Sequence, residues 1–76
     1  MKRYKIFVTG KEGIFDPAGE QSKTALANLG FTGVQDVSIG KFIEITVDDD
    51  ITEVQIGTMC DKLLANPVIE DYEIQR

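Results

Sequence analysis

The sequence contains few side chains that could carry out acid–base or nucleophilic chemistry. It has no histidine, and Cys60 is its only cysteine. Cys60 falls on the apolar side of a predicted helix, where a thiol usually acts as a small core side chain and not as a nucleophile. The usual general base, thiolate nucleophile and soft-metal ligands are therefore missing. This composition argues against catalysis by the chain on its own.

The loop Gly10–Phe15 follows the first predicted strand and is the first candidate for a ligand site. Its two glycines could adopt unusual backbone angles or let a ligand approach closely. A Walker phosphate loop needs serine or threonine after Gly-Lys, whereas here Glu12 follows Lys11 and its carboxylate would repel a phosphate. The loop also lacks the arginine of a small acylphosphatase and the Cys-x-x-Cys pair of a metal chaperone. We expect neither phosphate nor a soft metal here.

Three consecutive carboxylates, Asp48–Asp50, could in principle bind a hard cation. They lack the spaced ligands and the bidentate glutamate of a calcium loop, and the helix dipole alone attracts acidic residues to a helix start. We interpret the run as the beginning of a second helix. Two capping boxes fit that beginning: Asp50 with Glu53, and Thr52 with Gln55. We expect no metal or other cofactor in this chain.

The first helix is expected to start at Asp16-Pro17, where a carboxylate can cap free amides and proline occupies the first helical position. It should end before Gly30, which suits the left-handed residue after a helix, with Phe31 folded back onto Leu26. The buried side of this helix should consist of small and apolar residues, namely Ala18, Ser22, Ala25, Leu26 and Leu29.

The second helix is predicted by an apolar stripe at helical spacing: Ile56, Met59, Cys60, Leu63 and Leu64. It should end near Leu64 or Ala65, because Pro67 lacks a backbone N–H and clashes with the preceding turn. The dipeptide Asn66-Pro67 has two interpretations. Such dipeptides usually mark turns, but this one is also a candidate contact with a partner.

Period-two alternation predicts the strands. Residues 3–9 place Tyr4, Ile6 and Val8 on one face, residues 34–47 read as a hairpin turning at Gly40-Lys41, and a short strand follows Val68. In this pattern Phe7 and Phe42 fall on the face away from the core. That face is either solvated or in contact with another protein chain.

This element order predicts one α+β domain over residues 1–76. We expect a two-layer βαββαβ fold of ferredoxin-like order, with two helices on one face of a four-stranded antiparallel sheet. A chain this short buries only about 60% of its unfolded surface, so self-association is expected.

Net charge and hydropathy exclude several classes of partner. Thirteen acidic and eight basic side chains give a net charge of −5, which repels the phosphate backbone of nucleic acids. The apolar run Ile6–Val8 after the basic N-terminus is too short for a signal peptide or a membrane span. We therefore expect a cytoplasmic protein without a membrane or nucleic-acid partner.

Four stretches together resemble the PurS family: Gly13–Gly19, Leu29–Phe31, Val37–Lys41 and, above all, Cys60–Tyr72. The resemblance runs over essentially the whole chain, with the stretches in the order found in that family. The chain departs from the family pattern at Glu12, Ala18 and Ser38, where proline, glutamine and arginine are common. These differences do not affect the expected fold. They leave open whether this chain makes the family's specific contacts near the first loop and the hairpin.

The resemblance implies a role in de novo purine (IMP) biosynthesis, as the small subunit of phosphoribosylformylglycinamidine synthase. In that family the small subunit is understood to bridge a glutaminase subunit, PurQ, and a synthetase subunit, PurL, so that ammonia passes between them. The chain would belong to a glutamine-dependent carbon–nitrogen ligase whose ATP and Mg are used by the synthetase. The resemblance also implies a homo-oligomer. The interface candidates are Phe7, Phe42, Gly40, Lys41, Asn66 and Pro67.

An amino-acid-sensing regulatory domain of the ACT type is the competing hypothesis. Such domains share the element order and bind their ligand near a glycine loop after the first strand, which Gly13-Ile14 matches loosely. They are usually attached to an enzyme, and this chain has no room for a second domain. Calorimetry against amino acids would separate the two hypotheses.

Overall fold

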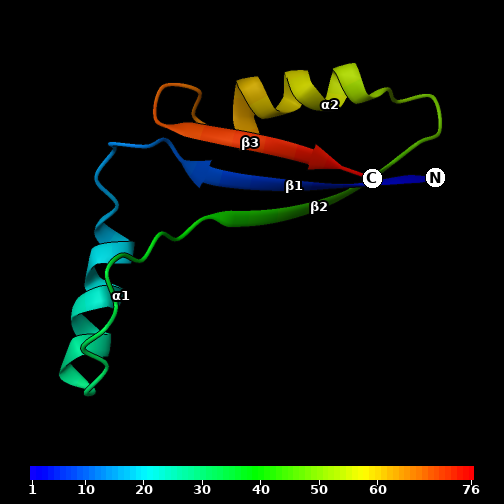
Figure 1. Ribbon diagram of the computed structural model, residues 1–76. Coiled ribbons are helices and arrows are strands. Elements are labelled where there is room, and N and C mark those ends of the chain that lie inside the picture. The colour runs from blue at the N-terminus through cyan, green and yellow to red at the C-terminus, as the bar shows by residue number, and fades with distance from the viewer.

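A three-stranded antiparallel sheet with strand order β2-β1-β3 forms the centre of the protein in the computed structural model, which describes residues 1–76 (Figure 1). The strands are β1 (Lys2–Gly10), β2 (Lys41–Val47) and β3 (Glu70–Gln75). β1 lies in the middle, where Ile6 stands opposite Ile43 of β2 on one side and Ile74 of β3 on the other. The expected strand over residues 3–9 is confirmed.

The core lies on one face of this sheet. Tyr4, Ile6 and Val8 of β1 are at most 1% exposed, as their alternation predicts. The helix α2 (Glu53–Met59) lies over the same face and contributes Ile56, which is also fully buried. One strand and one helix therefore supply most of the core.

The start of α2 decides between the two capping boxes that the sequence allows. The Thr52 hydroxyl accepts the Gln55 N–H at 3.3 Å, and the Gln55 side chain accepts the Thr52 N–H at 2.9 Å. Thr52 is therefore the N-cap of the helix, which begins at Glu53 and leaves Asp48–Asp50 in the preceding loop. There Asp49 lies 2.8 Å from the N-terminal amine of Met1.

The end of α2 is a π-helical turn, Cys60–Leu64, in which the Ala65 N–H donates to the Cys60 carbonyl at 2.9 Å. The extra residue in this turn rotates the following side chains relative to an α-helix. Leu63, expected on the buried stripe, is consequently 83% exposed, and Ala65 is buried in its place. The prediction that Leu63 is buried was wrong because a regular period does not anticipate the turn.

The helix α1 (Pro17–Asn28) has the ends that the sequence predicts. Asp16 caps its start by accepting the Gly19 N–H at 3.0 Å. After the helix, Gly30 has φ of +100°, and the Phe31 N–H donates to the Leu26 carbonyl at 3.0 Å. This is the Schellman geometry expected for a helix that stops at glycine.

The position of α1 differs from the prediction. α1 projects away from the sheet together with the returning segment that leads to β2, and we call residues 15–39 the arm (Figure 1). The expected placement of both helices on one face is therefore wrong. Ala18, Ala25 and Leu29, predicted to be buried, are exposed.

The predicted hairpin over residues 34–47 is also wrong, so the sheet has three strands and not four. Residues 34–39 are not part of the sheet, and the Asp16 carboxylate accepts the Ile39 N–H at 2.8 Å, which ties this segment to the start of α1. Gly19 permits the close approach, because a Cβ there would lie 2.1 Å from the Val37 carbonyl oxygen. These contacts hold the segment against α1.

The arm makes the molecule long and thin, with extents of 51 × 24 × 14 Å. Its radius of gyration is 15.8 Å, whereas a compact chain of this length has about 11 Å. None of the helices is long and apolar enough to cross a membrane.

The buried position of Cys60 gives a first prediction. Cys60→Ser places a hydroxyl in a fully buried apolar site, and should lower the free energy of unfolding by about 1 to 3 kcal/mol in urea denaturation. Ala27→Ser, which adds a hydroxyl at an exposed position of α1, is the matched control. Rapid reaction of the native thiol with a bulky reagent would contradict the assignment.

Candidate functional site

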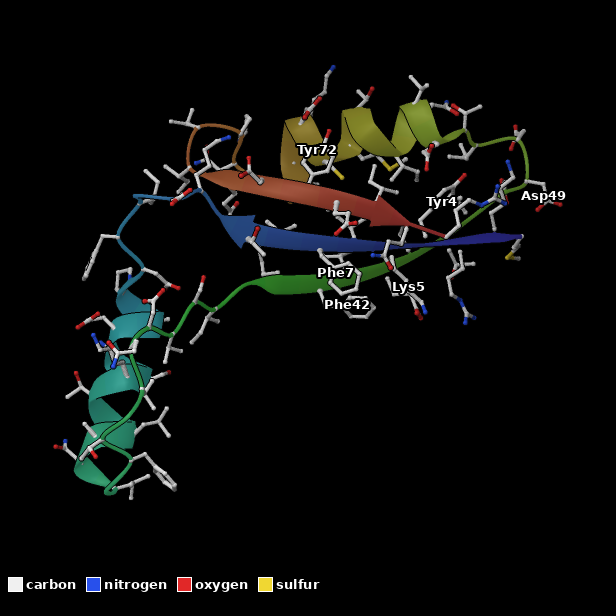
Figure 2. All side chains as sticks on the ribbon, viewed as in Figure 1. Tyr4, Lys5, Phe7, Phe42, Asp49 and Tyr72 are labelled. Carbon is white, nitrogen blue, oxygen red and sulfur yellow. The ribbon has the colours of Figure 1, made fainter.

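Phe7 and Phe42 form an aromatic pair on the sheet face opposite α2 (Figure 2). They stand opposite each other in the β1–β2 register, and their ring centroids are 5.0 Å apart with planes inclined by 43°. Phe7 is 38% exposed and Phe42 55% exposed. The predicted outward direction of both rings is confirmed, and their contact leaves a single apolar patch open to a partner.

Charged side chains surround this aromatic pair. Lys5 stands opposite Glu44 in the register, and the Arg3 guanidinium lies 3.9 Å from the Glu44 carboxylate. The Arg3–Glu44 ion pair is exposed, so it adds little to the stability of the fold. An apolar centre with a charged rim is the usual anatomy of a protein–protein contact.

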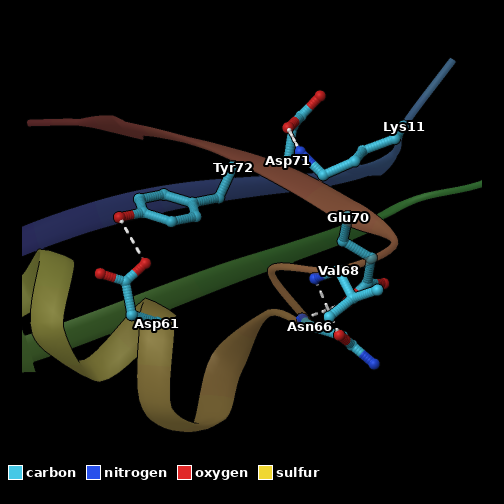
Figure 3. A network of polar contacts seen from close by, with 7 residues as sticks. All are labelled: Lys11, Asp61, Asn66, Val68, Glu70, Asp71 and Tyr72. Carbon is cyan, nitrogen blue, oxygen red and sulfur yellow. Dashed lines mark hydrogen bonds and ion pairs between the residues drawn. The ribbon is translucent and has the colours of Figure 1, made fainter.

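The turn at Asn66-Pro67 is built on hydrogen bonds of Asn66 (Figure 3). Its side-chain oxygen accepts the Val68 N–H at 3.0 Å, and its own N–H donates to the Glu70 carboxylate at 2.7 Å. Its carbonyl accepts the Glu70 N–H at 2.7 Å. Asn66 thus serves the turn itself, while Pro67 and Val68 are exposed at its tip. Whether the tip also contacts a partner stays a prediction.

Tyr72 and Asp61 form a link between β3 and the π-helical turn that sequence reasoning missed (Figure 3). The Tyr72 hydroxyl donates to the Asp61 carboxylate at 3.0 Å. This hydrogen bond is the main cause that raises the pKa of the Tyr72 phenol, and desolvation is the second. The signal in the sequence was only a tyrosine on the inner side of the last strand, which does not specify a polar partner.

The first loop contacts the residues at the start of β3, at the point where the arm leaves the sheet. The Lys11 ammonium lies 2.7 Å from the Asp71 carboxylate, and the Lys11 N–H donates to the Ile69 carbonyl at 2.9 Å. The first loop, far away in sequence, is therefore in direct contact with the stretch Cys60–Tyr72. This joint ties the base of the arm to the residues that lead into β3.

A hollow of about 300 Å³ lies beside this joint, between the first loop and residues 36–38. Its lining includes four carboxylates, from Glu12, Asp16, Glu20 and Asp36. The Ile39 and Gly19 N–H groups lower the pKa of Asp16, so its charge is engaged in the fold. No cluster of side chains is arranged to hold a metal ion. The hollow is unsuited to a phosphate because of its negative lining.

Gly40 and Lys41 mark the start of β2 and not a turn. A Cβ on Gly40 would lie 2.3 Å from the Val8 carbonyl oxygen, so only glycine fits beside β1. Lys41 stands opposite Val8 in the register, and its ammonium lies 3.9 Å from the Glu70 carboxylate. Gly40 thus has a structural role, whereas a partner contact of Lys41 stays a prediction.

The six sequence-predicted interface residues lie in three places. Phe7 and Phe42 come together on the open sheet face. Gly40-Lys41 lies where the arm joins β2, and Asn66-Pro67 lies in the connection between α2 and β3. They do not form one continuous site.

Comparisons with known proteins agree with the family suggested by the sequence. The PurS family model, described as phosphoribosylformylglycinamidine (FGAM) synthase, matches residues 3–76. Phosphoribosylformylglycinamidine synthase subunit PurS of Bacillus subtilis (strain 168) is 43% identical over 99% of this chain and 92% of that protein. A structure of B. subtilis PurS has a TM-score of 0.88 at 43% identity, covering 96% of this chain and 94% of that one. A chain in the structure of PurLQS from Thermotoga maritima has a TM-score of 0.69 at 25% identity, covering 99% and 98%.

The Tyr72–Asp61 hydrogen bond gives a second prediction. Asp61→Asn removes the charge that favours the protonated phenol, so the pKa of Tyr72 should fall toward the ordinary value of about 10. Because the folded-state pKa is raised, the stabilisation is complete below about pH 10 and is lost as the pH rises through the folded value.

A pH titration of ¹³C-labelled tyrosine rings by NMR measures this change. Asp71→Asn is the matched control, because the Asp71 carboxylate contacts Lys11 and not Tyr72. An unchanged Tyr72 titration in Asp61→Asn would show that the hydrogen bond does not hold the phenol in solution.

Proposed function

The chain belongs to the PurS family, and we propose that it acts in purine biosynthesis, in the cytoplasm, as a non-catalytic subunit of phosphoribosylformylglycinamidine synthase. The observation that carries this proposal is the match of residues 3–76 to the family, with 43% identity to a PurS subunit over nearly the full length of both chains. The family expected from the sequence is thus confirmed. A match over the whole chain does not favour the amino-acid-sensing alternative.

The proposed partners are a glutaminase subunit, PurQ, and an ATP-dependent synthetase subunit, PurL. Support comes from the PurLQS structure of T. maritima, one chain of which has the same fold as this protein. The proposed role is to bridge the two partners so that ammonia released by one reaches the other. Such a bridge acts by raising effective concentration and fixing orientation, and it requires binding surfaces but no reactive group.

The chemistry of the chain supports a non-catalytic role. Its single thiol, Cys60, is buried in the core, and desolvation together with the neighbouring Asp61 raises its pKa. A thiol with a raised pKa is mostly protonated at neutral pH and is a poor nucleophile. The ATP and Mg of the reaction are accordingly assigned to the synthetase partner.

Self-association is part of the proposal. The open sheet face carries Phe7 and Phe42, both more than a third exposed, at the centre of a charged rim. Burial of such rings against a second copy would remove a large apolar area from water. We propose this face as one contact of a homo-oligomer.

A third prediction tests that contact. Phe7→Lys should raise the dissociation constant of the oligomer about 30-fold, because burying one aromatic side chain is worth about 2 kcal/mol. Val54→Lys places the same charge on an exposed apolar position of α2 and should leave the oligomer unchanged. Sedimentation equilibrium measures both variants. A wild-type protein that is monomeric at micromolar concentration would refute the proposed contact.

A fourth prediction tests the function by reconstitution. Alone, the protein should neither hydrolyse glutamine nor consume ATP. Added to the glutaminase and synthetase partners, it should be required for glutamine-dependent amidation, whereas a high ammonia concentration should make it dispensable. Full glutamine-dependent activity from the two partners alone would remove the bridging role.

The same assay tests the turn at Asn66-Pro67. The double variant Asn66→Ala with Pro67→Ala should reduce the glutamine reaction about tenfold more than the ammonia reaction if the turn contacts a partner. Asn28→Ala, on the last turn of α1, is the control for loss of an exposed amide. Equal loss of both reactions, or loss of the circular dichroism spectrum, would assign the turn to folding alone.

A further inference from the structure

We propose that the free edge of β3 binds an extended segment of a partner subunit, which adds a strand to the sheet and carries a basic side chain opposite Glu73. This edge lies on the opposite side of the sheet from β2. The inference rests on the proposed role as a subunit that contacts other chains, and it specifies the chemistry of one such contact.

The first observation is a row of unpaired backbone groups on β3. β3 pairs with β1 on one side, and no strand lies on its other side. In an antiparallel pair, residues alternate between those that bond the neighbouring strand and those whose N–H and C=O groups face away. The Lys11 N–H donates to the Ile69 carbonyl, so every second residue counted from Ile69 bonds β1. Tyr72 and Ile74 fall between these residues, and their N–H and C=O groups therefore face the free edge.

These four groups have no partner within the chain. No hydrogen bond uses the N–H or the C=O of Tyr72 or Ile74, because Tyr72 takes part only through its hydroxyl. Glu70 faces the same edge, but its N–H is occupied by the Asn66 carbonyl at 2.7 Å. The first free N–H of the edge is therefore that of Tyr72. A strand edge with free donors and acceptors is a template for the addition of a strand from another chain.

The side chains of β3 give this edge a chemical preference. Tyr72 and Ile74 lie on the core face, where both are partly buried. Asp71 and Glu73 lie on the open face, where Glu73 stands opposite Phe7 of β1. Because cross-strand neighbours on one face interact, an added strand should offer apolar side chains on the core face and positive charge on the open face.

Glu73 is the carboxylate of β3 that has no partner. Lys41 lies 3.9 Å from the Glu70 carboxylate, and Lys11 lies 2.7 Å from that of Asp71. Glu73 is exposed and takes part in no ion pair or side-chain hydrogen bond within the chain. The residue opposite it in an added antiparallel strand would form a non-hydrogen-bonded pair, in which side chains approach most closely. The preferred segment therefore reads apolar, basic, apolar, with the basic residue opposite Glu73.

The β3 edge of a second copy does not supply such a segment. Antiparallel pairing of Tyr72 with Ile74 of the other copy places Glu73 opposite Glu73. The register centred on Tyr72 places Glu73 opposite Asp71, and the register centred on Ile74 runs past the end of β3 at Gln75. Like charges directly opposite each other are destabilising, and the net charge of −5 also repels a second copy. The edge thus selects a chain of different, basic composition.

Hydrogen exchange resolved to single amides tests the proposal on the full-length protein. In the protein alone, the Tyr72 and Ile74 amides should exchange fast, whereas those of Asp71 and Glu73 are held in the β1 ladder and serve as an internal control. When the glutaminase or the synthetase subunit is added in excess, the Tyr72 and Ile74 amides should exchange at least about tenfold more slowly. Unchanged exchange with both subunits would overturn the proposal, and so would protection that appears on self-association alone.

Reversal of the charge at Glu73 tests the preference for a basic segment. Glu73→Lys should raise the dissociation constant of the subunit that protects the edge about tenfold at low salt, because a repulsion replaces an attraction. The difference should shrink as salt is added. Glu53→Lys makes the same change at an exposed position of α2 and should leave the dissociation constant unchanged. Isothermal titration calorimetry measures all three proteins, and equal affinities of Glu73→Lys and the wild type would overturn the basic segment.

Methylation of one backbone nitrogen separates strand pairing from side-chain contacts. Cys60 allows residues 60–76 to be synthesised chemically and joined to residues 1–59 by native chemical ligation. An N-methyl group at Ile74 removes one donor of the edge and leaves every side chain in place, so it should raise the dissociation constant about tenfold. The unmodified ligated protein is the control, and circular dichroism compares the fold of the two. Equal affinities of two folded proteins would overturn strand addition.

The glutamine-dependent amidation assay is run on the same proteins. If the chain is required for amidation while Tyr72 and Ile74 stay unprotected, the bridging role holds and the β3 contact is refuted. If these amides are protected but the chain is not required for amidation, the contact holds and the bridging role is refuted.

Discussion

Everything in this fold depends on the burial of one face of the central strand. Tyr4, Ile6 and Val8 of β1 are almost completely inaccessible, and both other strands pair with β1 and not with each other. The helix α2 covers them and contributes Ile56, and the π-helical turn after it contributes Cys60. The buried apolar residues all lie in β1 or between Ile56 and Ala65. None lies in the arm, whose segments are joined by polar contacts instead.

Those polar contacts join the segments of the arm to one another and its base to β3. The Asp16 carboxylate binds the N–H groups of Gly19 and Ile39, which joins α1 to the segment returning from it. Its lowered pKa means that this stabilisation is present above the pKa of the unfolded carboxyl and is lost as the pH falls through the folded value. The Lys11–Asp71 pair at the base of the arm is exposed and contributes direction more than stability.

A small core with oriented projections suits a subunit that works through contacts. The aromatic pair on the open face, the arm and the turn at Asn66-Pro67 point to different sides of the molecule, so they can engage different neighbours at once. The geometry therefore agrees with a bridging subunit whose contribution to the enzyme is the relative position of its partners.

By itself the sequence determined the features that depend on near neighbours along the chain. The cap at Asp16, the stop at Gly30 and the inward alternation of β1 could all be read from a few adjacent residues, and so could the family. Only the tertiary structure decided where α1 lies, that no hairpin forms at Gly40, and that Leu63 turns outward. Which edge a strand pairs with, and which surface a helix covers, depends on competition between distant segments. In this chain α1 and residues 34–39 find no partner in their own sheet, and local sequence signals carry no information about that competition.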